Sequence, residues 1–317
     1  MTTEVLIVGR DSDVFAEHLG PQFPKLRFRC AHNAAEALAA GGNCEILLVR
    51  NDEIFADLIA AMPRLRFIQA LTTGTDYMAA LPNLPPQVLV AAARGFHGPQ
   101  MSELAFLFML AFARKFPAVL ENQRRRIWDR REQRLLAGKT AVIVGVGQIA
   151  EELAHRCKVF GMTVIGVSSR SSAPGFDAIY PRARLAEAAG LADFLIVLAP
   201  LTEENRNLID AAAINAMKPD GVLINIARGG VVDEDALLKA LAAKRIAGAG
   251  LDVFEKEPLP PDSPLWDTPN VMITSHVGGM SEEYADQVMP LLIDNLRAFV
   301  DGKPERMSYI VNDGRMG

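Results

Sequence analysis

The stretch Thr140-Ala-Val-Ile-Val-Gly-Val-Gly-Gln-Ile-Ala150 decides the fold, because it has the pattern of a dinucleotide cradle. Its β-branched run at residues 141–144 predicts a buried parallel strand, and the apolar periodicity of residues 148–160 predicts a helix. Gly145 and Gly147 between them permit a tight turn and a close backbone approach to a pyrophosphate, which the helix N-terminus would face. The third glycine position holds alanine, which the motif allows. Taken alone, such a pattern has an ordinary strand-to-helix turn as its alternative.

A second buried-strand run, residues 163–167, ends where NAD-binding proteins carry an acidic side chain for the ribose 2′-hydroxyl. This chain has Ser168-Ser169-Arg170 there instead. An aspartate would repel a 2′-phosphate, whereas a guanidinium forks onto phosphate oxygens and hydroxyls add neutral hydrogen bonds. The segment therefore predicts NADP(H) as the preferred cofactor over NAD(H). The alternative is that Arg170 is a solvated loop residue.

The overall charge argues against nucleic acid as the main partner. At 317 residues the chain can hold two domains of ordinary size, and its net charge is −5. Basic side chains concentrate only between Arg124 and Arg134, in a polar stretch just before the glycine motif. We interpret that stretch as a solvated surface, with an anionic ligand or a subunit interface as further options.

The cysteines and the hydropathy pattern predict a cytoplasmic protein without a metal centre. Cys30, Cys44 and Cys157 are odd in number and widely spaced, which favours reduced thiols and matches no metal-ligand pattern. The chain enters a strand near Glu4 without an apolar leader, and no apolar run reaches membrane-spanning length. We therefore expect no membrane partner.

Short apolar runs alternate with helical patterns along the chain, which predicts an α/β fold of two doubly wound, Rossmann-like parallel sheets separated by a cleft. The similar starts Val5-Leu-Ile-Val-Gly9 and Ala141-Val-Ile-Val-Gly145 indicate two related halves, of which only the second carries a full phosphate cradle. Residues 101–114 are apolar nearly all round, so we expect a buried helix there, packed between domains or subunits. The expected strands lie at residues 4–8, 46–49, 67–71 and 88–91 in the first half, and at 141–144, 163–167, 194–198, 222–226, 247–250 and 271–274 in the second.

Charged groups follow three strands of the second half, at the edge where open α/β sheets bind ligands. Arg228 comes just past one strand, Asp252 and Glu257 lie beyond the next, and His276 stands at the end of the last. Reduction of a 2-keto acid requires an arginine that forks onto the carboxylate, a histidine that donates a proton to the developing alkoxide, and a carboxylate that holds the imidazole. Taken singly, each residue has a structural alternative as a surface charge, a loop carboxylate or a hydrogen-bonded loop imidazole.

Together these segments resemble the D-isomer-specific 2-hydroxyacid dehydrogenase family over nearly the whole chain. The motifs that carry the resemblance are Gly145-Val-Gly-Gln-Ile-Ala150, Leu198-Ala-Pro-Leu-Thr202, Asn225-Ile-Ala-Arg-Gly-Gly230, Asp252-Val-Phe-Glu-Lys-Glu-Pro258 and His276-Val-Gly-Gly279. The resemblance implies an oxidoreductase that transfers a hydride between a nicotinamide dinucleotide and a small 2-keto or 2-hydroxy acid of D configuration. Ser168 favours similarity to the NADP-dependent glyoxylate/hydroxypyruvate reductase members.

By this resemblance, Arg228, Glu257 and His276 form the catalytic set, and Arg228 also binds the substrate. The segment Leu71-Thr-Thr-Gly-Thr-Asp76 resembles the substrate loop of the family, so backbone N–H groups around Thr73 and Gly74 are expected to hold the substrate carboxylate. Asp252 is expected near the nicotinamide carboxamide. The motifs and the resemblance together give the expected cofactor-binding residues as Gly145, Gly147, Gln148, Ile149, Ser168, Ser169, Arg170, Pro200, Ala227, Asp252 and Gly279.

Family members place the substrate domain at both chain ends. We therefore expect a flavodoxin-like substrate-binding domain at residues 1–100 and 287–317, and a dinucleotide-binding Rossmann domain at 101–286. The cleft is expected to close by hinge motion near residues 98–101 and 285–288. The resemblance also implies a homodimer. The alternative function is a dinucleotide-sensing, non-catalytic scaffold of the corepressor type, because such relatives can retain the three catalytic residues.

Two positions depart from the family pattern. Asn205 stands where a threonine is usual, and Ala92 stands where an asparagine often precedes the crossover. These departures leave details of the cofactor loop open and do not affect the chemistry. NADP usage favours the reductive direction.

Overall fold

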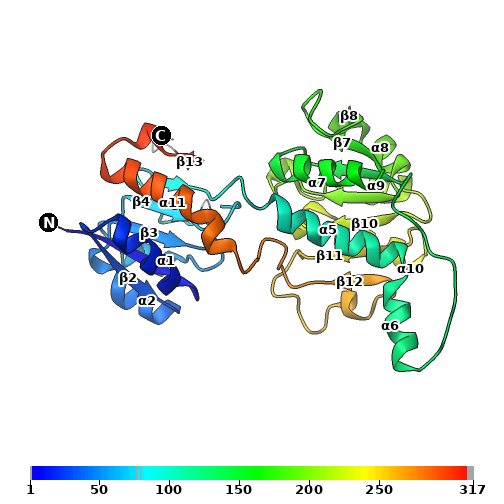
Figure 1. Cartoon of the computed structure of the whole chain (residues 1–317), viewed down its shortest axis with the longest axis horizontal. Coiled ribbons are helices and arrows are strands. Elements are labelled where there is room, and N and C mark those ends of the chain that lie inside the picture. The colour runs from blue at the N-terminus through cyan, green and yellow to red at the C-terminus, as the bar shows by residue number, and fades with distance from the viewer. Residues whose placement is uncertain (1, 76–77, 79, 313–317) are drawn as a thin grey trace. The chain divides into compact units, whose positions relative to one another are not determined.

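The structure, a computed structural model, describes residues 2–75, 78 and 80–312. Its contacts divide the chain into two compact units (Figure 1). Unit 1 comprises Met1–Phe96 with Ser281–Gly317, and unit 2 comprises His97–Met280. Each unit has its own α/β core built on a largely parallel sheet, which confirms the predicted fold class.

The unit boundaries lie a few residues before the expected ones, for reasons that the helices explain. Helix α5 (Gly98–Ala113) packs against α7 (Gln148–Val159) inside unit 2, so the division falls before it. Helix α11 (Tyr284–Val300) buries Tyr284 and Val288 in the core of unit 1. A boundary at residue 287 would therefore have cut through α11, and residues 285–288, expected as a hinge, are helical.

Unit 1 is a doubly wound sheet with the strand order β2-β1-β3-β4-β5-β13. The first five strands are parallel in the 2-1-3-4-5 order of flavodoxin, and β13 pairs antiparallel with β5. Along β1, Val5 and Ile7 face one core cluster and Leu6 and Val8 face the other. Besides α11, its elements are β1 (Thr3–Val8), α1 (Ser12–Leu19), β2 (Leu26–Ala31), α2 (Ala34–Ala40), β3 (Ile46–Val49), α3 (Ala56–Ala60), β4 (Phe67–Ala70), β5 (Leu89–Ala91) and β13 (Ile310–Asn312).

Unit 2 is a seven-stranded parallel sheet with the order β12-β11-β10-β9-β6-β7-β8. Six of these strands have the Rossmann order 3-2-1-4-5-6, so the order in which strands are added to the sheet reverses between β6 and β9, which remain parallel. Helices α5 and α7 contribute to one core cluster, and α8, α9 and α10 contribute to the other. The remaining elements are α6 (Phe116–Arg124), β6 (Thr140–Val144), β7 (Thr163–Val167), β8 (Ala178–Tyr180), α8 (Leu185–Leu191), β9 (Phe194–Val197), α9 (Ala211–Ala216), β10 (Val222–Asn225), α10 (Glu234–Ala242), β11 (Gly248–Leu251) and β12 (Val271–Ile273).

Besides the three-residue antiparallel edge strand β13, two strands of the structure have no counterpart among the expected ones. Strand β2 alternates charged and apolar side chains, Arg27 and Arg29 with Phe28 and Cys30, because it is an edge strand with one wet face. Strand β8 is only three residues long and also lies at an edge. Neither forms the continuous apolar run that indicates a buried parallel strand.

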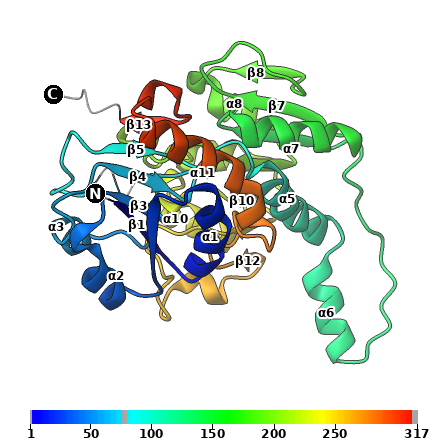
Figure 2. The ribbon, with the colours of Figure 1, turned by 60° about the vertical axis from the view of Figure 1, so that its left-hand side comes forward.

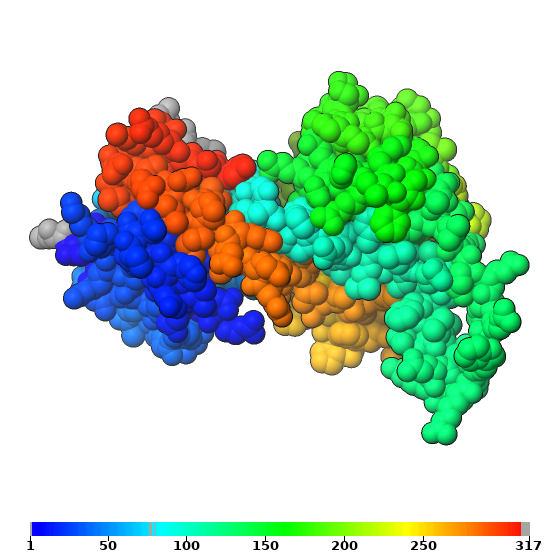
Figure 3. Space-filling model, viewed as in Figure 1, coloured from blue at the N-terminus to red at the C-terminus, as the bar shows by residue number. Residues whose placement is uncertain are grey.

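Helix α5 is less buried than its composition predicts. Leu107 is 55% exposed and Leu110 is 38% exposed, so this face of the expected buried helix is not covered within the chain. Helix α6 follows α5. This helix and the segment after it stand away from the sheet of unit 2 (Figures 1 and 2). The space-filling view shows the same segment as a projection from unit 2 (Figure 3). Among the described residues, no helix is both long and apolar enough to traverse a bilayer.

Candidate active site

The glycine turn after β6 leaves room for a ligand at the start of α7. Gly145 has φ +95°, and a Cβ there would lie 2.6 Å from the backbone nitrogen of Ala199, so only glycine fits. Gly147 is the N-cap residue of α7, so no side chain caps the N-terminus of this helix. A Cβ built on Gly147 would meet no atom within 4 Å. The turn is thus tight at its first glycine and open at its second, which fits a pyrophosphate at the helix N-terminus.

The loop after β7 carries the three residues predicted to select the cofactor. Ser168 is half-buried, whereas Ser169 and Arg170 are exposed. The backbone N–H of Arg170 donates to Oγ of Ser168 at 3.2 Å. Its guanidinium forms an ion pair with Glu151, the Nη1 to Oε1 distance being 2.6 Å. The structure therefore places Arg170 beside the glycine turn, in contact with the protein rather than only with solvent.

Two further predicted cofactor residues, Pro200 and Ala227, lie on loops that side-chain hydrogen bonds stabilise. Pro200 follows β9, and its carbonyl accepts a hydrogen bond from Nδ2 of Asn205 at 2.9 Å. The departure at Asn205 thus supports the loop that holds Pro200. Ala227 follows β10, where Oδ1 of Asn225 accepts from its backbone N–H at 3.2 Å.

Arg228 lies in the loop that follows β10, and two hydrogen bonds tie it to neighbouring residues. Nδ2 of Asn225 donates to the Arg228 carbonyl at 2.9 Å, and Nη1 of Arg228 donates to the carbonyl of Ala227 at 2.7 Å. Next to it, Gly229 lies so close to the backbone of Phe254 that a Cβ would lie 1.8 Å from the Phe254 carbonyl carbon. The loops after β10 and β11 are therefore in backbone contact, which brings Arg228 near the Glu257 loop.

His276 and Glu257 form a hydrogen-bonded pair. Nδ1 of His276 lies 2.7 Å from Oε2 of Glu257, a position in which the ring N–H donates to the carboxylate. Oε1 of the same carboxylate accepts from the backbone N–H of Phe254 at 2.9 Å. The imidazole side chain is 45% exposed and the carboxylate side chain 26% exposed. The carboxylate thus fixes the ring orientation and leaves Nε2 for a reacting group.

The charges of these residues are coupled. The hydrogen bond to Glu257 is the main cause that raises the pKa of His276, and it outweighs burial and the Arg228 charge, which lower it. Burial works to raise the pKa of the Glu257 carboxyl, but the bonds from His276 and Phe254 and the Arg228 charge bring it below its usual range. The pair therefore favours a charged imidazolium beside a carboxylate, as a proton donor near neutral pH requires.

Asp252 supports the loop that carries His276. Its buried carboxylate accepts from the hydroxyl of Thr274 at 2.5 Å and from the backbone N–H groups of Val277 and Gly278, each at 2.9 Å. His276 itself has φ +53°, and its N–H donates to the Asp252 carbonyl at 2.8 Å. These bonds stabilise a strained backbone position, and we interpret Asp252 as the residue that orients the histidine loop.

Two supporting residues were missed by the sequence reasoning. Glu234, in the first turn of α10, accepts a hydrogen bond at 2.5 Å from the N–H of Glu255, and burial raises its pKa. Thr274 holds Asp252 through its hydroxyl. Glu234 is a typical acidic residue at a helix start and Thr274 a typical strand residue, so no sequence pattern indicates either role. His97, which the sequence places in a glycine-containing loop, is buried. Its Cδ2 would lie 3.2 Å from a Cβ built on Gly279.

The predicted substrate loop lies in unit 1, after β4. The Thr73 hydroxyl donates to the Ala93 carbonyl at 2.9 Å, and the Thr72 hydroxyl donates to the Gly74 carbonyl at 2.9 Å. The loop is therefore tied to the segment after β5. Asp76, the last residue of the quoted motif, lies outside the described residues. The role of Thr73 and Gly74 in substrate binding stays a prediction.

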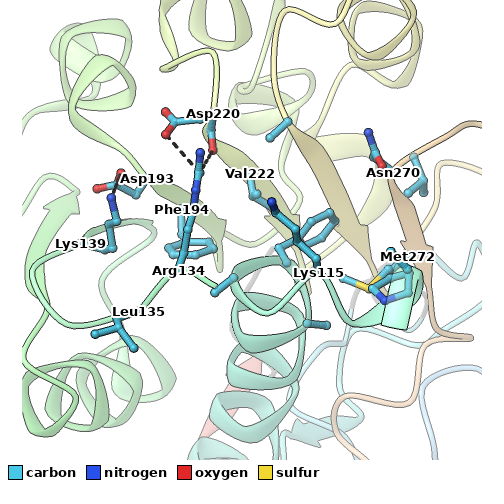
Figure 4. Close-up of a pocket in the computed structure, with 17 residues that line it drawn as sticks. Lys115, Arg134, Leu135, Lys139, Asp193, Phe194, Asp220, Val222, Asn270 and Met272 are labelled. Carbon is cyan, nitrogen blue, oxygen red and sulfur yellow. Dashed lines mark hydrogen bonds and ion pairs between the residues drawn. The ribbon is translucent and has the colours of Figure 1, made fainter. Parts of the chain in front are cut away.

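A separate pocket of about 400 Å³ lies at the opposite end of the same sheet (Figure 4). Its lining includes Phe194, Val222 and Val271, the first residues of β9, β10 and β12, whereas the predicted catalytic residues follow strand ends. Arg134 lines the pocket and forms an ion pair with Asp220 at 3.1 Å. This pocket is therefore distinct from the candidate active site.

Comparison with known proteins identifies the family. A sequence profile described as D-isomer specific 2-hydroxyacid dehydrogenase, NAD binding domain, matches residues 106–278. A hydroxyphenylpyruvate reductase of Plectranthus scutellarioides is 32% identical over 305 residues, which cover 95% of this chain and 96% of that protein. The chain spans only about half, 51%, of the length of the D-3-phosphoglycerate dehydrogenase of Methanocaldococcus jannaschii, to which it is 31% identical.

Solved structures agree with this result. A D-isomer specific 2-hydroxyacid dehydrogenase family protein of Aeromonas salmonicida superposes with a TM-score of 0.91 at 32% identity, covering 99% of this chain and all of that one. The NADPH-dependent glyoxylate/hydroxypyruvate reductase of Sinorhizobium meliloti, solved with NADP and sulfate, has a TM-score of 0.85 at 27% identity and 98% coverage of both chains. The chain therefore belongs to the D-isomer-specific 2-hydroxyacid dehydrogenase family and carries its NAD-binding domain in unit 2.

Proposed function

We propose that the protein is an NADPH-dependent reductase of small 2-keto acids of the glyoxylate or hydroxypyruvate type, which forms the D-2-hydroxy acid. One observation carries the proposal: the His276–Glu257 pair and Arg228 follow the neighbouring strands β12, β11 and β10, in the sheet that also bears the glycine turn. Proton donor, orienting carboxylate and anion-binding cation thus lie at the carboxyl edge where such sheets bind ligands.

The three residues have separate tasks in this reaction. Arg228 binds the substrate carboxylate and polarises the ketone oxygen. His276 donates the proton of Nε2 to the oxygen as negative charge develops on it, and Glu257 stabilises the imidazolium through Nδ1. Bound NADPH supplies the hydride that C2 of the substrate receives.

The NADP preference rests on the loop after β7. Arg170 provides a guanidinium beside the glycine turn, and Ser168 and Ser169 provide hydroxyls where an acidic residue would select NAD. A protein of the same family, 27% identical to this chain, is an NADPH-dependent glyoxylate/hydroxypyruvate reductase. For the substrate carboxylate, backbone N–H groups around Thr73 and Gly74 are the proposed second anchor.

Steady-state oxidation of NADPH and NADH against glyoxylate, hydroxypyruvate, pyruvate and phenylpyruvate tests the proposal. We expect turnover with at least one keto acid and a clear preference for NADPH. Equal or better kinetics with NADH would contradict the cofactor preference alone. Tight dinucleotide binding without turnover on any keto acid would instead favour the non-catalytic, dinucleotide-sensing scaffold.

We also propose that the protein is a homodimer, because the segment of unit 2 between residues 107 and 135 exposes several large apolar side chains. Trp128 is 91% exposed, an unusual environment for this side chain. The other members are Leu107, Leu110, Phe116, Val119, Leu120, Ile127 and Leu135. Light scattering after size exclusion is expected to give twice the chain mass, and a charged substitution such as Leu120→Glu is expected to give the monomer. A monomeric parent protein would refute the proposal.

A cytoplasmic location is part of the same proposal. The three cysteines, Cys30, Cys44 and Cys157, are free thiols, and two of them are buried. Unpaired cysteines are typical of reducing compartments.

A further inference from the structure

Arg170 and Glu151 form a contact between two parts of the candidate cofactor site. Arg170 follows β7, and Glu151 lies in the first turn of α7, directly after the glycine turn. Nη1 of Arg170 lies 2.6 Å from Oε1 of Glu151 and also donates to the carbonyl of Val146 at 3.4 Å. Val146 is the residue between the two glycines of the turn. The guanidinium is therefore held over the turn by one of its nitrogens.

The rest of the guanidinium remains available. In the part of the chain that the structure describes, no hydrogen bond or ion pair involves Nε or Nη2 of Arg170. An arginine presents five N–H donors in a fixed plane, and the Nε–Nη2 edge can bind two oxygens of one phosphate. The Arg170 side chain is 44% exposed and that of Glu151 is 31% exposed, so the pair is open to an incoming ligand.

Two opposite effects of Glu151 on a phosphate ligand have to be weighed. Its negative charge repels the phosphate, but this repulsion acts in an exposed, highly screened place. Its bond to Nη1 restricts a long side chain that otherwise samples many rotamers, and a preorganised arginine loses less entropy on binding. Because Glu151 contacts Nη1 and leaves the Nε–Nη2 edge unengaged, the restriction favours binding.

We propose that Glu151 is a positioning residue for cofactor selection: it holds Arg170 so that the protein prefers a dinucleotide with a 2′-phosphate. This inference rests on the proposed role of Arg170 in NADPH binding and adds to it a residue outside the expected cofactor set. Glu151 acts through Arg170 and needs no contact with the cofactor itself.

Calorimetric titration of the full-length protein with 2′,5′-ADP and with 5′-AMP tests the inference, because the two ligands differ only in the 2′-phosphate. In the Glu151→Gln variant we expect 2′,5′-ADP to bind about two- to fivefold more weakly, the range of one exposed ion pair, and 5′-AMP to bind as before. Titration with NADPH and NADH is expected to give the same selective loss. These readouts require no catalytic turnover.

The matched control is Glu152→Gln. Glu152 is the next residue of the same helix, and its carboxylate binds Nε of Arg156 at 2.8 Å instead of Arg170. The variant removes the same charge from nearly the same place, so it measures the general electrostatic effect on the phosphate. We expect Glu152→Gln to bind 2′,5′-ADP as tightly as the parent protein or slightly more tightly.

Arg170→Ala separates failure of this inference from failure of the proposed cofactor preference. If Arg170→Ala leaves the ratio of 2′,5′-ADP to 5′-AMP affinity unchanged, the NADPH assignment itself is wrong. If Arg170→Ala abolishes the preference while Glu151→Gln leaves it unchanged or increases it, only the positioning role is overturned. In support of the role, the double variant Glu151→Gln/Arg170→Ala is expected to bind both ligands like Arg170→Ala alone.

Discussion

The two units start with closely similar segments, Val5-Leu-Ile-Val-Gly9 in unit 1 and Ala141-Val-Ile-Val-Gly145 in unit 2. In both, the strand is buried and the glycine has a positive φ. In both, the glycine N–H donates to the last residue of the next strand, Ala31 or Val167. The helix then begins three residues after the glycine in each unit. The backbone plan of the two turns is therefore the same.

The turns differ at the helix N-cap and in the space before it. The N-cap is Asp11 in unit 1 and Gly147 in unit 2. The first glycine is tight in both turns: a Cβ on Gly9 would lie 2.7 Å from a carboxylate oxygen of Glu53, and a Cβ on Gly145 would lie 2.6 Å from the backbone nitrogen of Ala199. At the N-cap position of unit 2, a Cβ on Gly147 would meet nothing within 4 Å. Burial raises the pKa of Glu53, with the Asp52 charge adding to the effect. The unit 1 turn thus carries acidic side chains at both places, Glu53 beside its glycine and Asp11 at its N-cap, where unit 2 has the Ala199 backbone and Gly147. The same backbone plan therefore favours an anion only in unit 2.

The comparison assigns the chemistry to unit 2, and the largest expected effect tests whether turnover depends on His276 of that unit. His276→Ala is expected to lower turnover by about 10²- to 10⁴-fold, the usual contribution of a general acid. Cofactor affinity, measured by fluorescence titration, is expected to stay near that of the parent protein. Turnover close to that of the parent would contradict the assignment of His276.

Gly147→Asp tests the difference between the two turns directly, since it gives unit 2 the N-cap of unit 1. An aspartate is a favourable N-cap, so the melting temperature is expected to change little. The carboxylate would face the cofactor phosphates, and we expect NADPH to bind about 100-fold more weakly.

The reverse change, Asp11→Gly, serves as the matched control. Calorimetry is expected to show one cofactor per chain for this variant, as for the parent, because Glu53 remains in front of Gly9. Normal NADPH binding by Gly147→Asp would show that the N-cap does not separate the two turns. A second cofactor bound by Asp11→Gly would show that Glu53 does not block the turn of unit 1.

The next effect concerns Arg228, whose role requires a fork and not only a charge. Arg228→Ala is expected to lower kcat/KM about 10- to 100-fold, the range for hydrogen bonds to a charged group. Arg228→Lys is expected to restore little of it, because an ammonium lacks the planar pair of donors. Steady-state kinetics with the best keto acid measures both variants, and full rescue by lysine would rule out a bidentate role.

The smallest effect is a shift in the pH dependence of reduction. His276 must be protonated to act as the acid, so kcat is expected to hold below its raised pKa and to fall as the pH rises through it. Glu257→Gln removes the main cause of the raised pKa, so the fall is expected at lower pH. A pH profile of kcat for both proteins measures the shift, and an unchanged profile would mean that Glu257 does not control the titration of His276.

Much of this fold follows from local sequence patterns. The strands β3, β6, β7 and β9 are buried apolar runs, and such runs show directly in the sequence. Strand β2 could not be predicted, because its charged residues belong to an edge strand with one solvent-exposed face. The exposed face of α5 also could not be predicted, since composition does not show which apolar side chains find a neighbour.

In the candidate site, too, local sequence patterns predict some features and not others. Arg228, Glu257 and His276 follow strands, so the parallel topology alone predicts that they lie at one edge of the sheet. The contacts of Glu234 with Glu255 and of Glu151 with Arg170 join residues that are far apart in the sequence. They depend on how loops fold back onto helices, which no local pattern specifies.

We propose that unit 2 holds a hydride-transfer site for 2-keto acids. The most direct test incubates the protein with NADPH deuterated at C4 of the nicotinamide and with each keto acid of the panel, and then examines the products by NMR. We expect a 2-hydroxy acid that carries deuterium at C2, formed by the parent protein and hardly at all by His276→Ala. Bound cofactor with no deuterated hydroxy acid from any of the keto acids would contradict it.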